Sequence, residues 1–144
     1  MLTAANLKSY TAKDLAQMAK DVDILVVITP GGPSTAKLVS KDVIEALGPN
    51  GILINVSRGT VVDEEEMISA LQDGRLGSAG LDVFATEPNV PESLRSLENV
   101  SLTPHIGSAT VETREAMGDL VVRNLNSFFA NGKVEISVPE TAHL

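Results

Sequence analysis

Short, largely apolar segments alternate with amphipathic segments along most of the chain, and this alternation restricts the fold more than any other feature. The apolar segments at 24–28, 52–56, 78–84 and 100–102 have the length and aliphatic content of strands. The β-branched run 24–28 is typical of a strand that is buried on both faces. Strands that alternate with helices form βαβ units with right-handed crossovers. We therefore predict an α/β fold with a parallel sheet and helices on both faces.

Signals for helix starts and stops divide the remaining segments. Capping residues at Thr11, Ser40 and Asp63 predict three helix starts, and the glycines at 48 and 74 follow the expected ends of the second and third helices. The longest amphipathic segment, 110–129, predicts a helix that Ser108 caps and that stops before Gly132.

Composition excludes several classes of function. The 144 residues suit one domain of ordinary size, and 43% hydrophobic with 3% aromatic residues implies an aliphatic core. The net charge of −8 argues against nucleic-acid and anionic-membrane partners, which attract basic surfaces. No segment approaches the roughly 20 apolar residues of a membrane helix. The chain has no cysteine, which excludes disulfides and thiolate metal sites and fits a cytoplasmic protein.

Polar side chains follow each expected strand at its carboxyl end. Parallel strands present these ends at one edge of the sheet, where open α/β sheets bind their ligands. The sequence therefore predicts a site at this edge, made from residues that are far apart in the chain: Thr29, Pro30, Ser57, Arg58, Asp82, Glu87 and His105.

His105 is the residue best suited to proton transfer, because an imidazole changes its charge near neutral pH. Pro104 stiffens the approach to it, and Gly107 allows the backbone to turn or to approach a ligand closely. A cap at Ser108 would direct the first helical amides toward the same cleft. The alternative for a single histidine is an ordinary surface or core position.

Arg58 and Glu87 offer partners for that histidine. A guanidinium matches a carboxylate with two parallel hydrogen bonds, so Arg58 can bind a small organic acid. A carboxylate beside a histidine fixes the tautomer of the ring, which gives Glu87 a role. The alternatives are a solvent-facing arginine at a strand end and one solvated acid among the 19 in the chain.

Asp82 lies within an expected apolar strand, where an unpaired carboxylate costs several kcal/mol. We expect it to contact a ligand, a backbone donor or a cation, or simply to cap a loop. The pair Thr29–Pro30 can shape a pocket for adenine or ribose, although most such turns are only turns. The sequence has no H-E-x-x-H pattern and His143 is remote from His105, so we predict no metal site.

Taken together, these residues resemble the D-isomer-specific 2-hydroxyacid dehydrogenase family. Three segments match in order and spacing, and the likeness extends from about residue 10 to about residue 139: Asn55–Gly59 with Val62–Asp63, Gly80–Phe84 with Glu87–Pro88, and Pro104–Ser108. The segment 107–114 looks closest to the hydroxypyruvate and glyoxylate reductase branch.

The resemblance implies the chemistry, which the residues alone do not show. It implies hydride transfer between a nicotinamide and C2 of a small 2-oxo acid, with Arg58, Glu87 and His105 as the catalytic set. In that reading protonated His105 donates the proton, and Glu87 holds the ring of His105 in its charged form. Arg58 binds the substrate. Cofactor contacts are implied for these residues: Thr29, Pro30, Val56, Ser57, Arg58, Asp82, His105, Gly107 and Ser108.

The chain also departs from the family, whose members are usually more than twice as long. It has no G-x-G-x-x-G loop for the pyrophosphate and lacks the first strands of a Rossmann-like sheet. We interpret 1–132 as the carboxyl part of the dinucleotide-binding domain and 133–144 as a tail that returns toward a missing substrate domain. Such a fragment should bind cofactor poorly, and its exposed sheet edge should favour a homodimer.

Two questions remain open at this stage. The cofactor can be NAD or NADP, because the residue that reads the ribose 2′ position lies outside the chain; the likeness to hydroxypyruvate reductases tilts the prediction toward NADP. A non-enzymatic, corepressor-like binding protein is the alternative to an oxidoreductase, since such proteins keep similar residues.

Overall fold

The computed structural model describes residues 8–138. They fall into two compact units, with the division between His105 and Ile106. The residues expected to be catalytic all belong to the first unit.

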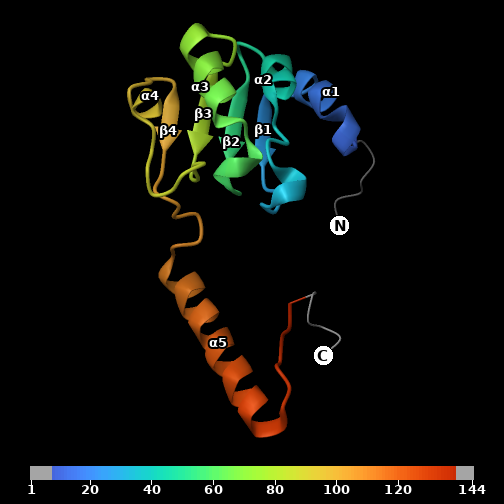
Figure 1. Cartoon of the computed structure of the whole chain (residues 1–144), viewed down its shortest axis with the longest axis vertical. Helices are drawn as coiled ribbons and strands as arrows, with labels where there is room; N and C mark the ends of the chain where they lie inside the picture. Colours follow the sequence, from blue (N-terminus) through green and yellow to red (C-terminus); the bar gives the residue numbers. More distant parts are fainter. Residues whose placement is uncertain (1–7, 139–144) are drawn as a thin grey trace. The chain divides into compact units, whose positions relative to one another are not determined.

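The first unit is built on a parallel sheet of four strands in the order β1 (Ile24–Val27), β2 (Ile52–Asn55), β3 (Ser78–Leu81) and β4 (Val100–Leu102) (Figure 1). The register aligns Leu25 with Leu53, Leu53 with Ala79, and Ala79 with Val100. The α/β class and the parallel sheet predicted from the sequence are confirmed. All four carboxyl ends therefore meet at one edge.

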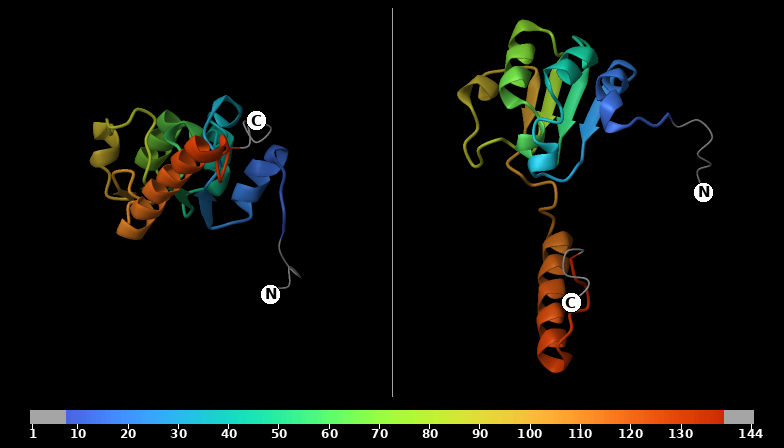
Figure 2. Two further views of the ribbon diagram at one scale, coloured as in Figure 1. Left: turned by 90° about the horizontal axis from the view of Figure 1, so that it is seen from below. Right: turned by 45° about the vertical axis from the view of Figure 1, so that its right-hand side comes forward.

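The helices and short 3₁₀ turns of this unit connect the strands (Figures 1 and 2). The start signals at Thr11, Ser40 and Asp63 each precede a helical segment. Gly48 and Gly74 have positive φ and follow the ends of α2 (Lys41–Leu47) and α3 (Glu64–Asp73). The segments, in chain order, are η1 (Ala12–Asp14), α1 (Leu15–Lys20), η2 (Pro33–Thr35), α2 (Lys41–Leu47), η3 (Gly59–Val61), α3 (Glu64–Asp73) and α4 (Glu92–Arg95).

One face of the sheet holds the core. Leu53 at 0% exposure packs in one cluster with Ile44 of α2, Met67 of α3 and Leu94 of α4. On the other face, Ile24 and Val26 are each 53% exposed. The prediction that 24–28 is buried on both faces is therefore wrong, and in this unit the buried strand positions lie on one face. The aliphatic composition of β1 is typical of a strand that is covered on both faces. In this unit, however, α1 to α4 all contribute to one and the same core cluster.

Strand β3 ends at Leu81, three residues earlier than the sequence suggested. The Thr103 N–H donates to Leu81 O, and beyond it the chain turns, with the His105 N–H donating to Thr103 O. His105 has a φ of +54°, in the left-handed region that non-glycine residues rarely adopt. Because β3 ends at Leu81, Asp82 lies in the loop after β3 rather than within the strand.

The second unit contains α5 (Val111–Asn131) and the segment after it. Thr110 caps this helix, because its hydroxyl accepts a hydrogen bond from the Thr113 N–H at 3.2 Å. The prediction that Ser108 is the cap is therefore wrong. Residues 133–138 fold back within the unit, where the Asn124 side chain bonds to the backbone of Glu135 and Ile136. No helix within residues 8–138 is long and apolar enough to cross a membrane.

Candidate functional site

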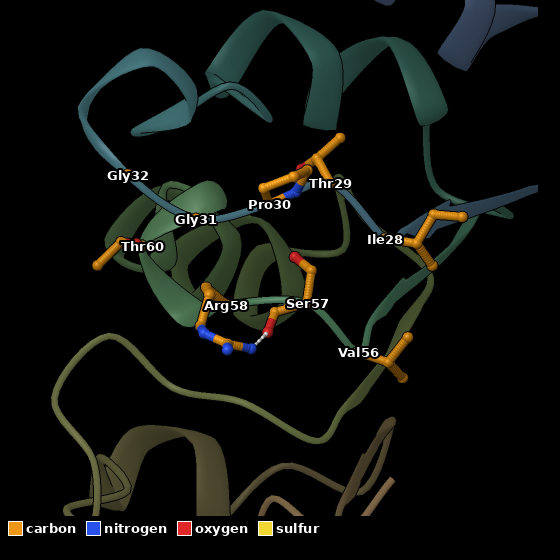
Figure 3. Close-up of a pocket in the computed structure, with 9 residues that line it drawn as sticks. All are labelled: Ile28, Thr29, Pro30, Gly31, Gly32, Val56, Ser57, Arg58 and Thr60. Carbon is orange, nitrogen blue, oxygen red and sulfur yellow. Dashed lines mark hydrogen bonds between the residues drawn. The ribbon is translucent and has the colours of Figure 1, made fainter. Parts of the chain in front are cut away.

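A pocket of about 720 Å³ opens where β1 and β2 end (Figure 3). It includes five residues that the sequence assigned to the cofactor, and they come from two loops about 27 residues apart in the chain. The structure thus brings these distant segments together. The lining residues are Ile28, Thr29, Pro30, Gly31, Gly32, Val56, Ser57, Arg58 and Thr60.

The turn after β2 is organised by a buried amide. Asn55 is 1% exposed and its Oδ1 accepts hydrogen bonds from both the N–H and the hydroxyl of Ser57, each at 3.0 Å. Its Nδ2 donates to Arg58 O at 3.1 Å. Arg58 is exposed, and its Nη1 donates to Ser57 O at 2.6 Å (Figure 3).

Two glycines let other backbone segments approach this turn closely. A Cβ on Gly31 would lie 2.6 Å from Cγ of Arg58, so the arginine stem packs directly on the loop after β1. A Cβ on Gly59 would lie 1.9 Å from the carbonyl carbon of Phe84. The turn that bears Arg58 is thereby in contact with the loop that bears Glu87.

His105 and Glu87 form a direct pair at the same edge of the sheet. Nδ1 of His105 lies 2.7 Å from Oε2 of Glu87, and Oε1 of Glu87 accepts a hydrogen bond from the Phe84 N–H at 3.0 Å. The bond with His105 lowers the pKa of the Glu87 carboxyl below its ordinary 4.5. The Phe84 N–H and the charges of His105 and Arg58 lower this pKa further.

A smaller, mainly apolar pocket of about 130 Å³ adjoins this pair. The two ionisable residues that line it are Glu87 and His105. The imidazole therefore borders a space that can hold a few apolar atoms of a ligand. The remaining lining residues are Phe84, Pro88, Val90 and Pro104.

Asp82 is 6% exposed and is stabilised at the end of β3. Its Oδ1 accepts a hydrogen bond from the Thr103 hydroxyl at 2.5 Å, and its N–H donates to Asn55 O at 3.0 Å. A ligand, a backbone donor or a cation was expected for this carboxylate. Its Oδ1 instead accepts from a side-chain hydroxyl, that of Thr103. Asp82 thus links the ends of β2, β3 and β4.

The Thr29 hydroxyl indicates whether the larger pocket suits a polar ligand such as a nucleotide. Its Oγ1 is the buried side-chain oxygen within residues 8–138 that has no hydrogen-bond partner. Thr29 also lines the larger pocket, together with the glycine-containing loop 30–32. A polar ligand would satisfy such an oxygen, so these residues fit the ribose or adenine side of a nicotinamide nucleotide.

Some predicted site residues stay untested by this geometry, and others escaped prediction. Gly107 and Ser108 belong to the second unit, and their place in a cofactor cleft remains a prediction. The roles of Asn55 and Thr103 were missed, although Asn55 ends a buried strand, where a polar side chain must find partners. Gly31 gave no signal, because its need for a glycine arises from contact with Arg58.

A family model for the NAD binding domain of the D-isomer specific 2-hydroxyacid dehydrogenases matches residues 3–107. The chain belongs to this family. The matched segment includes the whole sheet and also Arg58, Glu87 and His105. The resemblance drawn from the three short motifs is confirmed.

Relatives of this chain are reductases by name. It is 57% identical over 116 residues to hydroxyphenylpyruvate reductase of Plectranthus scutellarioides, which covers 81% of the chain. It is 57% identical over 120 residues to glyoxylate/hydroxypyruvate reductase A of Arabidopsis thaliana, which covers 83%. These names give no support to the corepressor alternative.

A solved structure shows the same fold. The NADPH-dependent glyoxylate/hydroxypyruvate reductase of Sinorhizobium meliloti, in complex with NADP and malonate, matches with a TM-score of 0.86 and 57% identity over 88% of this chain. The dehydrogenase domain spans 37% of the two plant relatives and 40% of the bacterial chain.

Proposed function

We propose that this chain is the catalytic-residue-bearing part of a reductase that transfers a hydride from a nicotinamide to a small 2-oxo acid of the glyoxylate or hydroxypyruvate type. The observation that supports this most is the His105–Glu87 pair at the carboxyl edge of the sheet, next to the turn of Arg58, whose Gly59 packs on the Phe84 backbone. This edge offers a proton donor in His105 and, in Arg58, a cation suited to a carboxylate.

In this proposal His105 is the general acid. Glu87 holds Nδ1, which leaves Nε2 as the ring nitrogen that can reach a substrate. The proton moves from the protonated ring to the carbonyl oxygen as that carbon is reduced, and the neutral ring is later reprotonated from solvent. Glu87 has a lowered pKa and so stays ionised near neutral pH, where its Oε2 holds Nδ1 and orients the ring.

Arg58 binds the carboxylate of the substrate and polarises its carbonyl. A guanidinium provides two parallel donors for this task, which a lysine cannot. Such binding orients the 2-oxo group toward His105, and orientation of this kind accounts for a large part of enzymatic rate enhancement.

A bound nicotinamide nucleotide would supply the hydride. Thr29, Pro30, Val56 and Ser57 line the pocket that would hold it, and the unpartnered Thr29 hydroxyl offers a hydrogen bond. We also assign Asp82, Gly107 and Ser108 to its binding. We favour NADP over NAD, because the Sinorhizobium meliloti relative is described as NADPH-dependent.

Assembly and location are further parts of the proposal. Within residues 8–138, β1 pairs with β2 alone, and β1 therefore leaves an unpaired edge at which a second copy can associate as a homodimer. The absence of cysteine fits the reducing cytoplasm.

The test is an assay of the longer protein that contains this chain, with NADH and NADPH against glyoxylate, hydroxypyruvate and pyruvate. We expect turnover with at least one of the first two acids, and faster with NADPH. Absence of turnover with every pair, in a preparation that binds nucleotide, would refute the proposal and favour a binding protein. The 144-residue chain alone should reduce nothing at a useful rate.

A further inference from the structure

We infer that Asn55 is the positioning residue for Arg58, and that its side-chain amide sets the geometry in which substrate is bound. The inference rests on the proposed function, because it assigns Asn55 a role through the arginine that binds the 2-oxo acid. Asn55 is the last residue of β2 and Arg58 lies three residues further along.

The contacts of Asn55 span the whole turn between the strand and the arginine. Oδ1 accepts from the Ser57 N–H and the Ser57 hydroxyl, and Nδ2 donates to Arg58 O. The side chain is buried, with 1% exposed, so water does not compete for these bonds. The turn is therefore held at its middle and at its end by one rigid amide.

Only a side chain with both a donor and an acceptor can make these contacts. An aspartate at 55 could still accept from Ser57, but its second oxygen would face the carbonyl of Arg58 without a proton between them. An alanine would leave all three groups without this partner. Burial of polar groups without partners is costly, so the turn should move to find others.

Movement of this turn would displace Arg58 relative to the His105–Glu87 pair. Gly59 packs against the backbone of Phe84, and the Phe84 N–H donates to Glu87. The position of Arg58 relative to the His105–Glu87 pair thus depends on the contact between these two backbone segments. A shift of the turn alters the distance from the guanidinium to the proton donor, while leaving that pair intact.

The first experiment measures kcat and KM of the longer protein carrying Asn55→Asp or Asn55→Ala. We expect kcat/KM for the 2-oxo acid to fall about 100-fold, with the affinity for NADPH changed far less. The matched control is Asn99→Asp, since the Asn99 amide also donates to backbone carbonyls, those of Leu71 and Gly77. Asn99 precedes β4, at the end of the sheet opposite the site, so this variant should keep its kcat/KM.

A double-mutant cycle separates positioning from general damage to the fold. If Asn55 acts through Arg58, Asn55→Ala should cost less than about twofold in an Arg58→Gln background. A cost as large as in the wild-type background would overturn the inference. An Asn99→Asp variant that loses as much kcat/KM as Asn55→Asp would overturn it as well.

A measurement without turnover keeps this inference separate from the proposed function. In the 144-residue chain, hydrogen exchange at the Ser57 amide should be slow and should accelerate about tenfold or more in Asn55→Ala. If wild-type protein shows no reductase activity but this acceleration occurs, the proposed function fails and the Asn55 contact stands. An unchanged Ser57 exchange rate would overturn the positioning role whatever the activity.

Discussion

Nδ1 of His105 and Oε2 of Glu87 lie 2.7 Å apart although the two residues are 18 positions apart in the chain. Glu87 belongs to the loop after β3 and His105 to the turn after β4, and these strands are parallel neighbours. The pair thus follows from strand order. Because parallel pairing places both carboxyl ends together, a short loop suffices to bring a carboxylate to an imidazole.

Replacement of Glu87 by glutamine should make stability less dependent on acid pH. The pKa of Glu87 is lowered in the folded chain, so its contribution to stability is complete above the ordinary value of 4.5 and is lost as the pH falls through the lower folded pKa. The Tm of the wild-type chain, measured from about pH 7 to about pH 3, should fall more steeply below 4.5 than that of Glu87→Gln. Parallel curves for the two proteins would show that the pair does not stabilise the fold.

Substitution of Gly59 by alanine should destabilise the chain by about 3 kcal/mol. The added methyl would overlap the backbone of Phe84, which cannot move without displacing the loop of Glu87. Gly80→Ala is the matched control, because its methyl would meet only the end of the flexible Ile54 side chain, at 2.8 Å. Urea denaturation measures both. Equal losses in the two variants would mean that the turn and the loop are not in firm contact.

Removal of the Thr103 hydroxyl should weaken the end of the sheet. Thr103→Val takes away the donor to Oδ1 of the buried Asp82, and we expect a loss of about 1–3 kcal/mol in urea denaturation. Thr103→Ser retains the hydroxyl and should recover most of that loss. If valine and serine variants are equally stable, the bond to Asp82 does not contribute.

Sequence patterns predicted the strands and the edge at which the site lies. Aliphatic runs ended by polar residues are local signals, and parallel order follows from the helices between them. The sequence could not show that β1 is buried on only one face. Ile24 and Val26 are apolar residues that also occur in strands covered on both faces. Whether a layer covers them depends on where other segments pack.

The finer features of the site depend on contacts between distant segments. Ser108 was the cap predicted from the sequence, and the geometry of the turn shows that Thr110 takes this position. The role of Asn55 depends on the turn that it stabilises, and the role of Gly31 depends on the position of the Arg58 stem. Such contacts cannot be predicted from residue propensities and motif spacing, because they depend on how distant segments pack.

The most direct test of the account is the rate of hydride transfer in the longer protein carrying His105→Gln. NADPH oxidation is followed in a single turnover with glyoxylate, and NADPH affinity is measured by fluorescence titration. We predict a rate about 1,000-fold below wild type with NADPH affinity nearly unchanged, because the variant lacks the proton donor. A variant that keeps more than about a tenth of the wild-type rate would contradict the assignment of His105 as the general acid.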